Sequence, residues 1–207
     1  MKFNLYFFIL AGMLCMLYKG LVLSLKAPRK LRIAGVVVCV LGLFRYGALI
    51  FLFMAGNIEF LYLLKPAVFL QYIYIPVICV CIFNIYMKKS KLSYIFSVLS
   101  FSIAFYFIII IKLGTYIKYL QGSGYVMNFQ FSYFPYITYF AFNIIVLSIT
   151  FMLLKGNKIL IRVAPLLSII EVAGAYLGIH IFPYLIIGEI IWLFAFIYSL
   201  NKVKKQV

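Results

Sequence analysis

Long apolar runs separated by short polar segments dominate the chain. Each run has about 20 residues or more, which is the length an α-helix needs to cross the hydrocarbon core of a bilayer. We therefore predict seven membrane-spanning helices. Their ranges are 3–25, 32–54, 60–87, 92–112, 132–154, 159–179 and 182–200. Because most connections are short, we expect an all-α bundle of mostly antiparallel neighbours that forms a single integral membrane domain, 1–207.

Two regions depart from this simple pattern. The third span, 60–87, is long and contains Pro66 in its first turn, where a helix loses no backbone donor, and Pro76 inside, where we expect a kink. The long connection, 113–131, contains a Gly-Ser-Gly turn signal at 122–124 among aromatic residues. We expect this connection to lie on the membrane surface or to cap the bundle.

The distribution of basic residues predicts the orientation of the chain. Most of its nineteen Lys and Arg residues flank alternate connections or lie in the C-terminal tail. They are Lys19, Lys26, Arg29, Lys30 and Arg32; Lys88, Lys89 and Lys91; Lys155, Lys158 and Arg162; and Lys202, Lys204 and Lys205. Basic loops resist translocation, so these segments should face the cytoplasm and contact anionic headgroups. The N-terminus is then outside and the C-terminus inside.

Composition excludes several classes of protein. With 68% hydrophobic residues, the chain has too little polar surface for a soluble domain, so its expected environment is the lipid bilayer of the cell membrane. The net charge of +16 does not indicate nucleic-acid binding, because it is dispersed over short loops. The four cysteines lie within apolar runs and lack C-x-x-C spacing. We predict no disulfide framework, no metal site and no cofactor.

The first span resembles a signal peptide, because Lys2 precedes an apolar run. However, Leu17, Tyr18 and Lys19 follow that run, in place of the small residues that a cleavage site requires. We therefore expect the first span to be retained as a membrane helix.

Three ionisable residues, Arg45, Glu171 and Glu189, lie deep within predicted spans. A charge at the bilayer centre costs at least about 2.5–3.5 kcal/mol, so it should face protein and have a partner. At about 1.5 Å per residue, all three lie roughly 16–18 Å above the cytoplasmic ends of their spans, and Asn143 falls in the same layer. We predict that these four residues form a charge network or binding site near the middle of the membrane.

Small residues share a helix face with two of these charges, which indicates that both point into the bundle, where helices approach closely. The small residues are Gly35 and Gly42 beside Arg45, and Gly174 and Gly178, in G-x-x-x-G spacing, beside Glu171.

Two interpretations of the charge layer stay open. In the structural one, Arg45 pairs with one glutamate, the other is protonated or bonded to Asn143, and the network holds the helices together. In the functional one, the unmatched acid serves a site for a proton, a cation or a polar solute. Catalysis is poorly supported, because no nucleophile–base spacing connects the single histidine, His180, to the buried acids.

The leading functional hypothesis is a small transporter-like or channel-like protein that uses this layer. The runner-up is a membrane-embedded sensor, receptor or accessory subunit that acts through helix contacts, with its basic tail available to a membrane protein partner. A lipid-modifying membrane enzyme is third. A water-lined cavity reaching the glutamates would favour transport, whereas a dry, fully paired network would favour the sensor.

Overall fold

In a computed structural model, the described residues are nearly all helical, at 87%. The structure describes residues 2–55, 59–86, 92–120, 124–130, 133–153, 159–177 and 183–204. The long helices are α1 (Lys2–Leu25), α2 (Arg29–Met54), α4 (Gln71–Tyr86), α5 (Leu92–Lys112), α6 (Tyr133–Leu153), α7 (Ile159–Tyr176) and α8 (Ile186–Lys204). The short elements are η1 (Glu59–Leu64), α3 (Lys65–Val68), β1 (Thr115–Leu120), β2 (Gly124–Phe129) and η2 (Pro183–Leu185).

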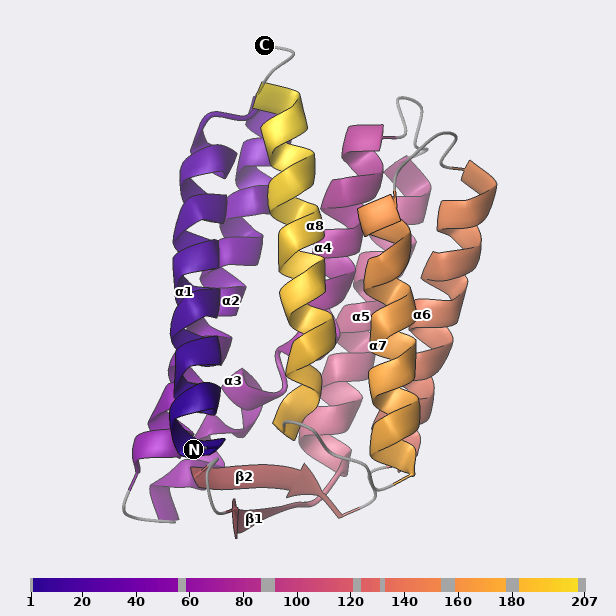
Figure 1. Cartoon of the computed structure of the whole chain (residues 1–207). Coiled ribbons are helices and arrows are strands. Elements are labelled where there is room, and N and C mark those ends of the chain that lie inside the picture. Colours follow the sequence, from indigo (N-terminus) through magenta and orange to yellow (C-terminus); the bar gives the residue numbers. More distant parts are fainter. Residues whose placement is uncertain are drawn as a thin grey trace.

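The long helices stand side by side, with the N-terminus and the β1–β2 hairpin at one end of the bundle and the C-terminus at the other (Figure 1). We call these ends the hairpin end and the tail end. Helices α1, α4, α6 and α8 run from the hairpin end to the tail end, and α2, α5 and α7 return. Helix α8 packs against α1, α4 and α7, and α2 packs against α1 and α4.

Six stretches of the described helices are long and apolar enough to cross a membrane, which is compatible with a multi-pass membrane protein. They are Leu5–Leu25, Leu31–Met54, Phe60–Tyr86, Tyr133–Met152, Ile159–Tyr176 and Pro183–Val203. A shorter apolar helix covers Val98–Lys112 in α5. The expected all-helical architecture is thus present in its main lines, with the hairpin as an exception.

Two helices are interrupted, which the apolar pattern did not predict. The expected span 60–87 is divided into η1, α3 and α4, with a turn at Phe69 and Leu70 between the last two. Pro76, where we expected a kink, lies inside α4 without ending it. Before α8, Tyr184 and Leu185 adopt left-handed φ angles of 66° and 55°. This conformation costs a residue with a side chain roughly 1–2 kcal/mol, so contacts elsewhere must hold it.

The long connection forms an antiparallel hairpin, with register running from Thr115↔Phe129 to Leu120↔Gly124. Strand β2 packs against α2 at the hairpin end (Figure 1). Gly124 has a φ of +72°, and a Cβ there would lie 2.8 Å from the Cα of Phe53. Position 124, the first residue of β2, therefore requires glycine both for its conformation and for its close approach to α2.

Two of the predicted packing glycines lie where α1 and α2 meet. A Cβ on Gly42 would lie 2.7 Å and 2.9 Å from the two terminal methyls of Leu17, and a Cβ on Gly35 would lie 2.8 Å from the Cβ of Ser24. These glycines let the helices approach closely. Gly174 is half-buried on α7. Gly178 and His180 lie outside the described residues.

Candidate functional site

Arg45 on α2 and Glu189 on α8 form an ion pair in the interior of the bundle. The Arg45 Nε donates to Glu189 Oε2 at 2.9 Å, and Nη2 donates to Oε1 of the same carboxylate. Both residues have an exposed fraction of 0%. This two-pronged geometry matches the planar fork of a guanidinium to a carboxylate, which makes the pair stronger and more directional than a lysine pair.

The rest of the guanidinium is bound by neutral oxygens. Its Nη2 also donates to Gln71 Oε1 and, at 3.3 Å, to the Tyr184 carbonyl, and its Nη1 donates to the Val68 carbonyl. Val68 ends α3 and Tyr184 lies in η2, so both carbonyls come from the interrupted helices. We call the oxygens of Glu189, Gln71, Val68 and Tyr184 around the guanidinium the Arg45 shell.

A tyrosine completes the binding of the carboxylate. The Tyr46 hydroxyl donates to Glu189 Oε2 at 2.8 Å, and Tyr46 is itself 0% exposed. Its ring packs edge-on against Tyr74, with ring centroids 6.3 Å apart. Buried charges are tolerated only when they are paired and hydrogen-bonded, and the pair of Arg45 and Glu189 meets both conditions without access to solvent.

Glu171 serves a different role from Glu189. From α7, its carboxylate accepts hydrogen bonds from the backbone N–H groups of Ile187, at 3.0 Å, and Gly188, at 2.7 Å. These are the first N–H groups of α8, which have no partner within their own helix and favour negative charge. Glu171 therefore caps α8 from a neighbouring helix. A Cβ on Gly188 would lie 2.5 Å from Ser168 Oγ and 3.1 Å from Glu171 Oε2, so the glycine lets α7 and α8 approach closely here.

Asn143 does not extend the ion pair. It is buried on α6, and its Nδ2 donates to the Tyr139 carbonyl of its own helix at 2.8 Å. Its Oδ1 is buried without a hydrogen-bond partner among the described residues. Of the four residues that the sequence assigns to one layer, the described hydrogen bonds join Arg45 to Glu189, Glu171 to the start of α8, and Asn143 to its own helix.

Tyr184 connects this site to the hairpin. Its hydroxyl accepts a hydrogen bond from the Met127 N–H of β2 at 2.6 Å, while its carbonyl belongs to the Arg45 shell. Tyr184, whose backbone is left-handed, is thus hydrogen-bonded both to the hairpin and to the buried guanidinium. Sequence reasoning missed this residue, and also Gln71 and Tyr46, although a glutamine in an apolar run is a signal of buried polar contacts.

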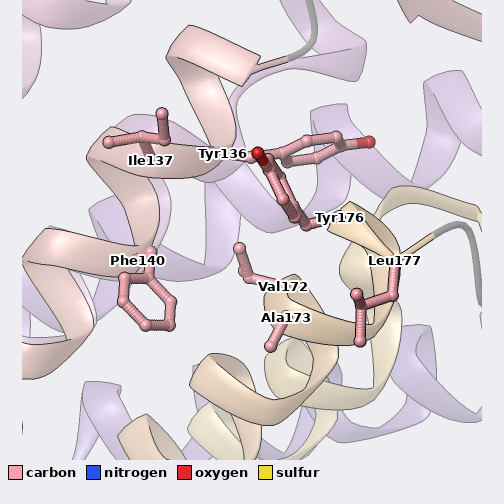
Figure 2. Close-up of a pocket in the computed structure, with 7 residues that line it drawn as sticks. All are labelled: Tyr136, Ile137, Phe140, Val172, Ala173, Tyr176 and Leu177. Carbon is pink, nitrogen blue, oxygen red and sulfur yellow. The ribbon is translucent and has the colours of Figure 1, made fainter.

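Three cavities are described in the bundle, and they lie outside this site. A groove of about 340 Å³ separates Tyr136, Ile137 and Phe140 of α6 from Val172, Ala173 and Tyr176 of α7 (Figure 2). A second groove, of about 510 Å³, lies between α2 and the η1–α3 segment. A third cavity, of about 20 Å³, lies between α4, α5 and α6. Neither Arg45 nor a glutamate lines any of these three.

Comparisons with protein-family models, curated proteins and solved structures give no match for this chain. Among the described residues, no group of three or more His, Cys, Asp and Glu side chains could hold a metal ion.

Proposed function

We propose that this chain is a membrane-embedded sensor or receptor of seven spanning helices, in which the hairpin end is outside the cell and the tail end is in the cytoplasm. In this proposal α5 is the seventh span. A change at the hairpin reaches α8, and through it the basic C-terminal tail, by way of helix contacts. A membrane protein partner reads the tail.

The observation that carries this proposal is the position of Tyr184. It lies directly before α8, its hydroxyl is bound by β2, and its carbonyl is bound by Arg45. Tyr184 and Leu185 are held in costly left-handed conformations, and strain of this kind clusters at switch regions, where surrounding contacts maintain it. Loss of the hairpin contact would remove one of the restraints that hold the start of α8 in place.

The ion pair supports a sensor better than a transporter. A transport site needs a path for its solute, whereas Arg45 and Glu189 are fully buried, hydrogen-bonded to each other and absent from the linings of the three described cavities. The closed network is suited to a bundle whose helices change position as units.

The charges at the tail end support the orientation. Exposed basic residues gather there, at the junction of α1 and α2 and near the end of α8. They include Lys26, Arg29, Arg32 and Lys202. Such residues favour the cytoplasmic side and attract anionic headgroups, worth about 1 kcal/mol for each charge near the surface.

The test compares two tyrosine variants in lipid nanodiscs. Spin labels at Leu25 of α1 and Tyr198 of α8, both more than half exposed, report the distance between these helices near the tail end, with the exposed Cys15 replaced by serine. We expect Tyr184→Phe to shift or broaden the distance distribution, because β2 loses its acceptor. Tyr116→Phe, which changes an exposed tyrosine of β1, should leave it unchanged.

Two results would contradict the proposal. Identical distance distributions in Tyr184→Phe and the unchanged protein would show that the hairpin contact does not control α8. Cation or proton flux in proteoliposomes that Glu189→Gln abolishes would instead establish transport.

A further inference from the structure

The Arg45 shell presents only hydrogen-bond acceptors to the guanidinium. The carboxylate of Glu189, the amide oxygen of Gln71 and the carbonyls of Val68 and Tyr184 converge on one buried position. All four come from segments outside α2, which supplies the guanidinium itself. The cation and the oxygens that bind it therefore belong to different parts of the chain, and the position of the oxygens can be considered without Arg45.

The Val68 side of the shell has its own supports. The Tyr106 hydroxyl of α5 donates to the Pro66 carbonyl at 2.8 Å, and the Lys65 Nζ donates to the Leu113 carbonyl at 2.7 Å. The ring of Phe69 stacks on Phe129 of β2, with centroids 4.0 Å apart. These three contacts join the segment 65–69 to α5, to Leu113 directly after α5, and to the hairpin. None of them involves the guanidinium.

The Tyr184 and Glu189 side is held in the same way. The Met127 N–H binds the Tyr184 hydroxyl, and Glu171 caps Ile187 and Gly188 at the start of α8. The Tyr46 hydroxyl, on α2, orients the Glu189 carboxylate. Every segment that contributes an oxygen to this side keeps at least one polar contact when the Arg45 side chain is removed.

We infer that the Arg45 shell is a preformed binding site for a guanidinium-type cation, which the chain fills with its own side chain. The two carboxylate oxygens match the edge of a planar guanidinium, and the neutral oxygens accept its outer N–H groups. Without Arg45, Glu189 would be left unpaired in a buried environment, where its charge must be neutralised by a proton or by a cation that replaces the guanidinium. This inference is independent of the proposed sensor function, because a bundle that never changes conformation would bind the cation equally well.

One of the described grooves passes close to this site, although neither Arg45 nor Glu189 lines it. The groove between α2 and the η1–α3 segment is lined by Ala48 and Ala67. Ala48 lies one helical turn from Arg45, and Ala67 precedes Val68 in the chain. Truncation of Arg45 would also leave the space of its side-chain stem, which an alkyl group on the ligand can fill.

The experiment is rescue of Arg45→Ala by ethylguanidinium, measured as the thermal stability of the purified protein in detergent. At ten times the dissociation constant we expect a saturable rise in Tm of roughly 3–6 °C. Tetramethylammonium at equal ionic strength should give no such rise, because it donates no hydrogen bonds. The matched controls are the unchanged protein, whose site is filled, and Arg45→Ala/Glu189→Gln, whose site lacks its charge. Neither should respond to ethylguanidinium.

A rise in Tm of equal size in the double variant would overturn the inference, as would no rise in Arg45→Ala. If Arg45→Ala does not purify as folded protein, expression and extraction are repeated with ethylguanidinium throughout, and the yield of monodisperse protein becomes the measurement. Recovery with ethylguanidinium, but not with tetramethylammonium, supports a preformed site. Equal yields with both cations, including no yield with either, count against it.

Discussion

Truncation of Arg45 isolates the contribution of the ion pair. Arg45→Ala removes the guanidinium and leaves the Glu189 carboxylate buried, with the Tyr46 hydroxyl as its remaining described donor. Breaking a buried pair by removing one partner typically costs about 3–5 kcal/mol, since the other charge stays in a low-dielectric site. For a domain of this size, that corresponds to a loss in Tm of roughly 6–20 °C. A small effect would indicate that water reaches the carboxylate.

The partner of Arg45 is identified by adding the second substitution. In the Arg45→Ala background, Glu189→Gln removes the uncompensated charge and should restore part of the stability, which gives a coupling energy of about 1–3 kcal/mol. Glu171→Gln should be additive with Arg45→Ala within about 0.5 kcal/mol, because Glu171 is bonded to backbone N–H groups of α8 instead.

The assay is a double-mutant cycle of thermal stability in one detergent, with each variant checked for a single monodisperse species. Additive losses for both glutamates would refute the buried pair of Arg45 and Glu189. Coupling of Arg45 to Glu171 in place of Glu189 would mean that α7 and α8 are rotated relative to the arrangement described above.

Three further predictions concern packing, capping and orientation. Gly42→Ala should lower the free energy of unfolding by about 1–3 kcal/mol through overpacking, whereas Gly47→Ala, with nothing within 4 Å of its added Cβ, should be close to neutral in the same thermal assay. Glu171→Ala should cost about 1–2 kcal/mol through loss of the α8 cap, and α8 amides should then exchange hydrogen faster. In whole cells, an impermeant thiol reagent should label Gly122→Cys and spare Ser90→Cys; the reverse pattern would invert the orientation.

The burial of Arg45 and Glu189 could be predicted from the sequence, but the choice of Glu189 over Glu171 as the partner could not. The sequence predicts nearly the same depth for Arg45, Glu171 and Glu189, so the predicted distance from the helix ends does not separate the two acids. The choice depends on how α7 and α8 are rotated about their axes, which the apolar runs do not determine because their residues are apolar on most sides. The structure places Glu189 against Arg45 and Glu171 over the start of α8.

Two parts of the site had no side-chain signal. The carbonyls of Val68 and Tyr184 are backbone atoms, and they face Arg45 because helices are interrupted within runs that look continuous in the sequence. The β1–β2 hairpin likewise had no clear signal in the sequence. Its strands have only six residues each, and the aromatic residues among them are equally typical of a segment lying at a membrane surface.

The separation of Arg45 and Glu189 along the chain has a consequence for biosynthesis. The two residues are 144 positions apart, so α2 is made well before its partner helix. At a synthesis rate of roughly 5–20 residues per second, Glu189 is made about 7–30 s after Arg45. In a bilayer, an unpaired arginine costs at least about 2.5–3.5 kcal/mol during that interval. In nascent chains that stop before α8, α2 should therefore be poorly retained in the membrane, and these chains should be degraded first. Synthesis of α8 supplies the partner that stabilises α2.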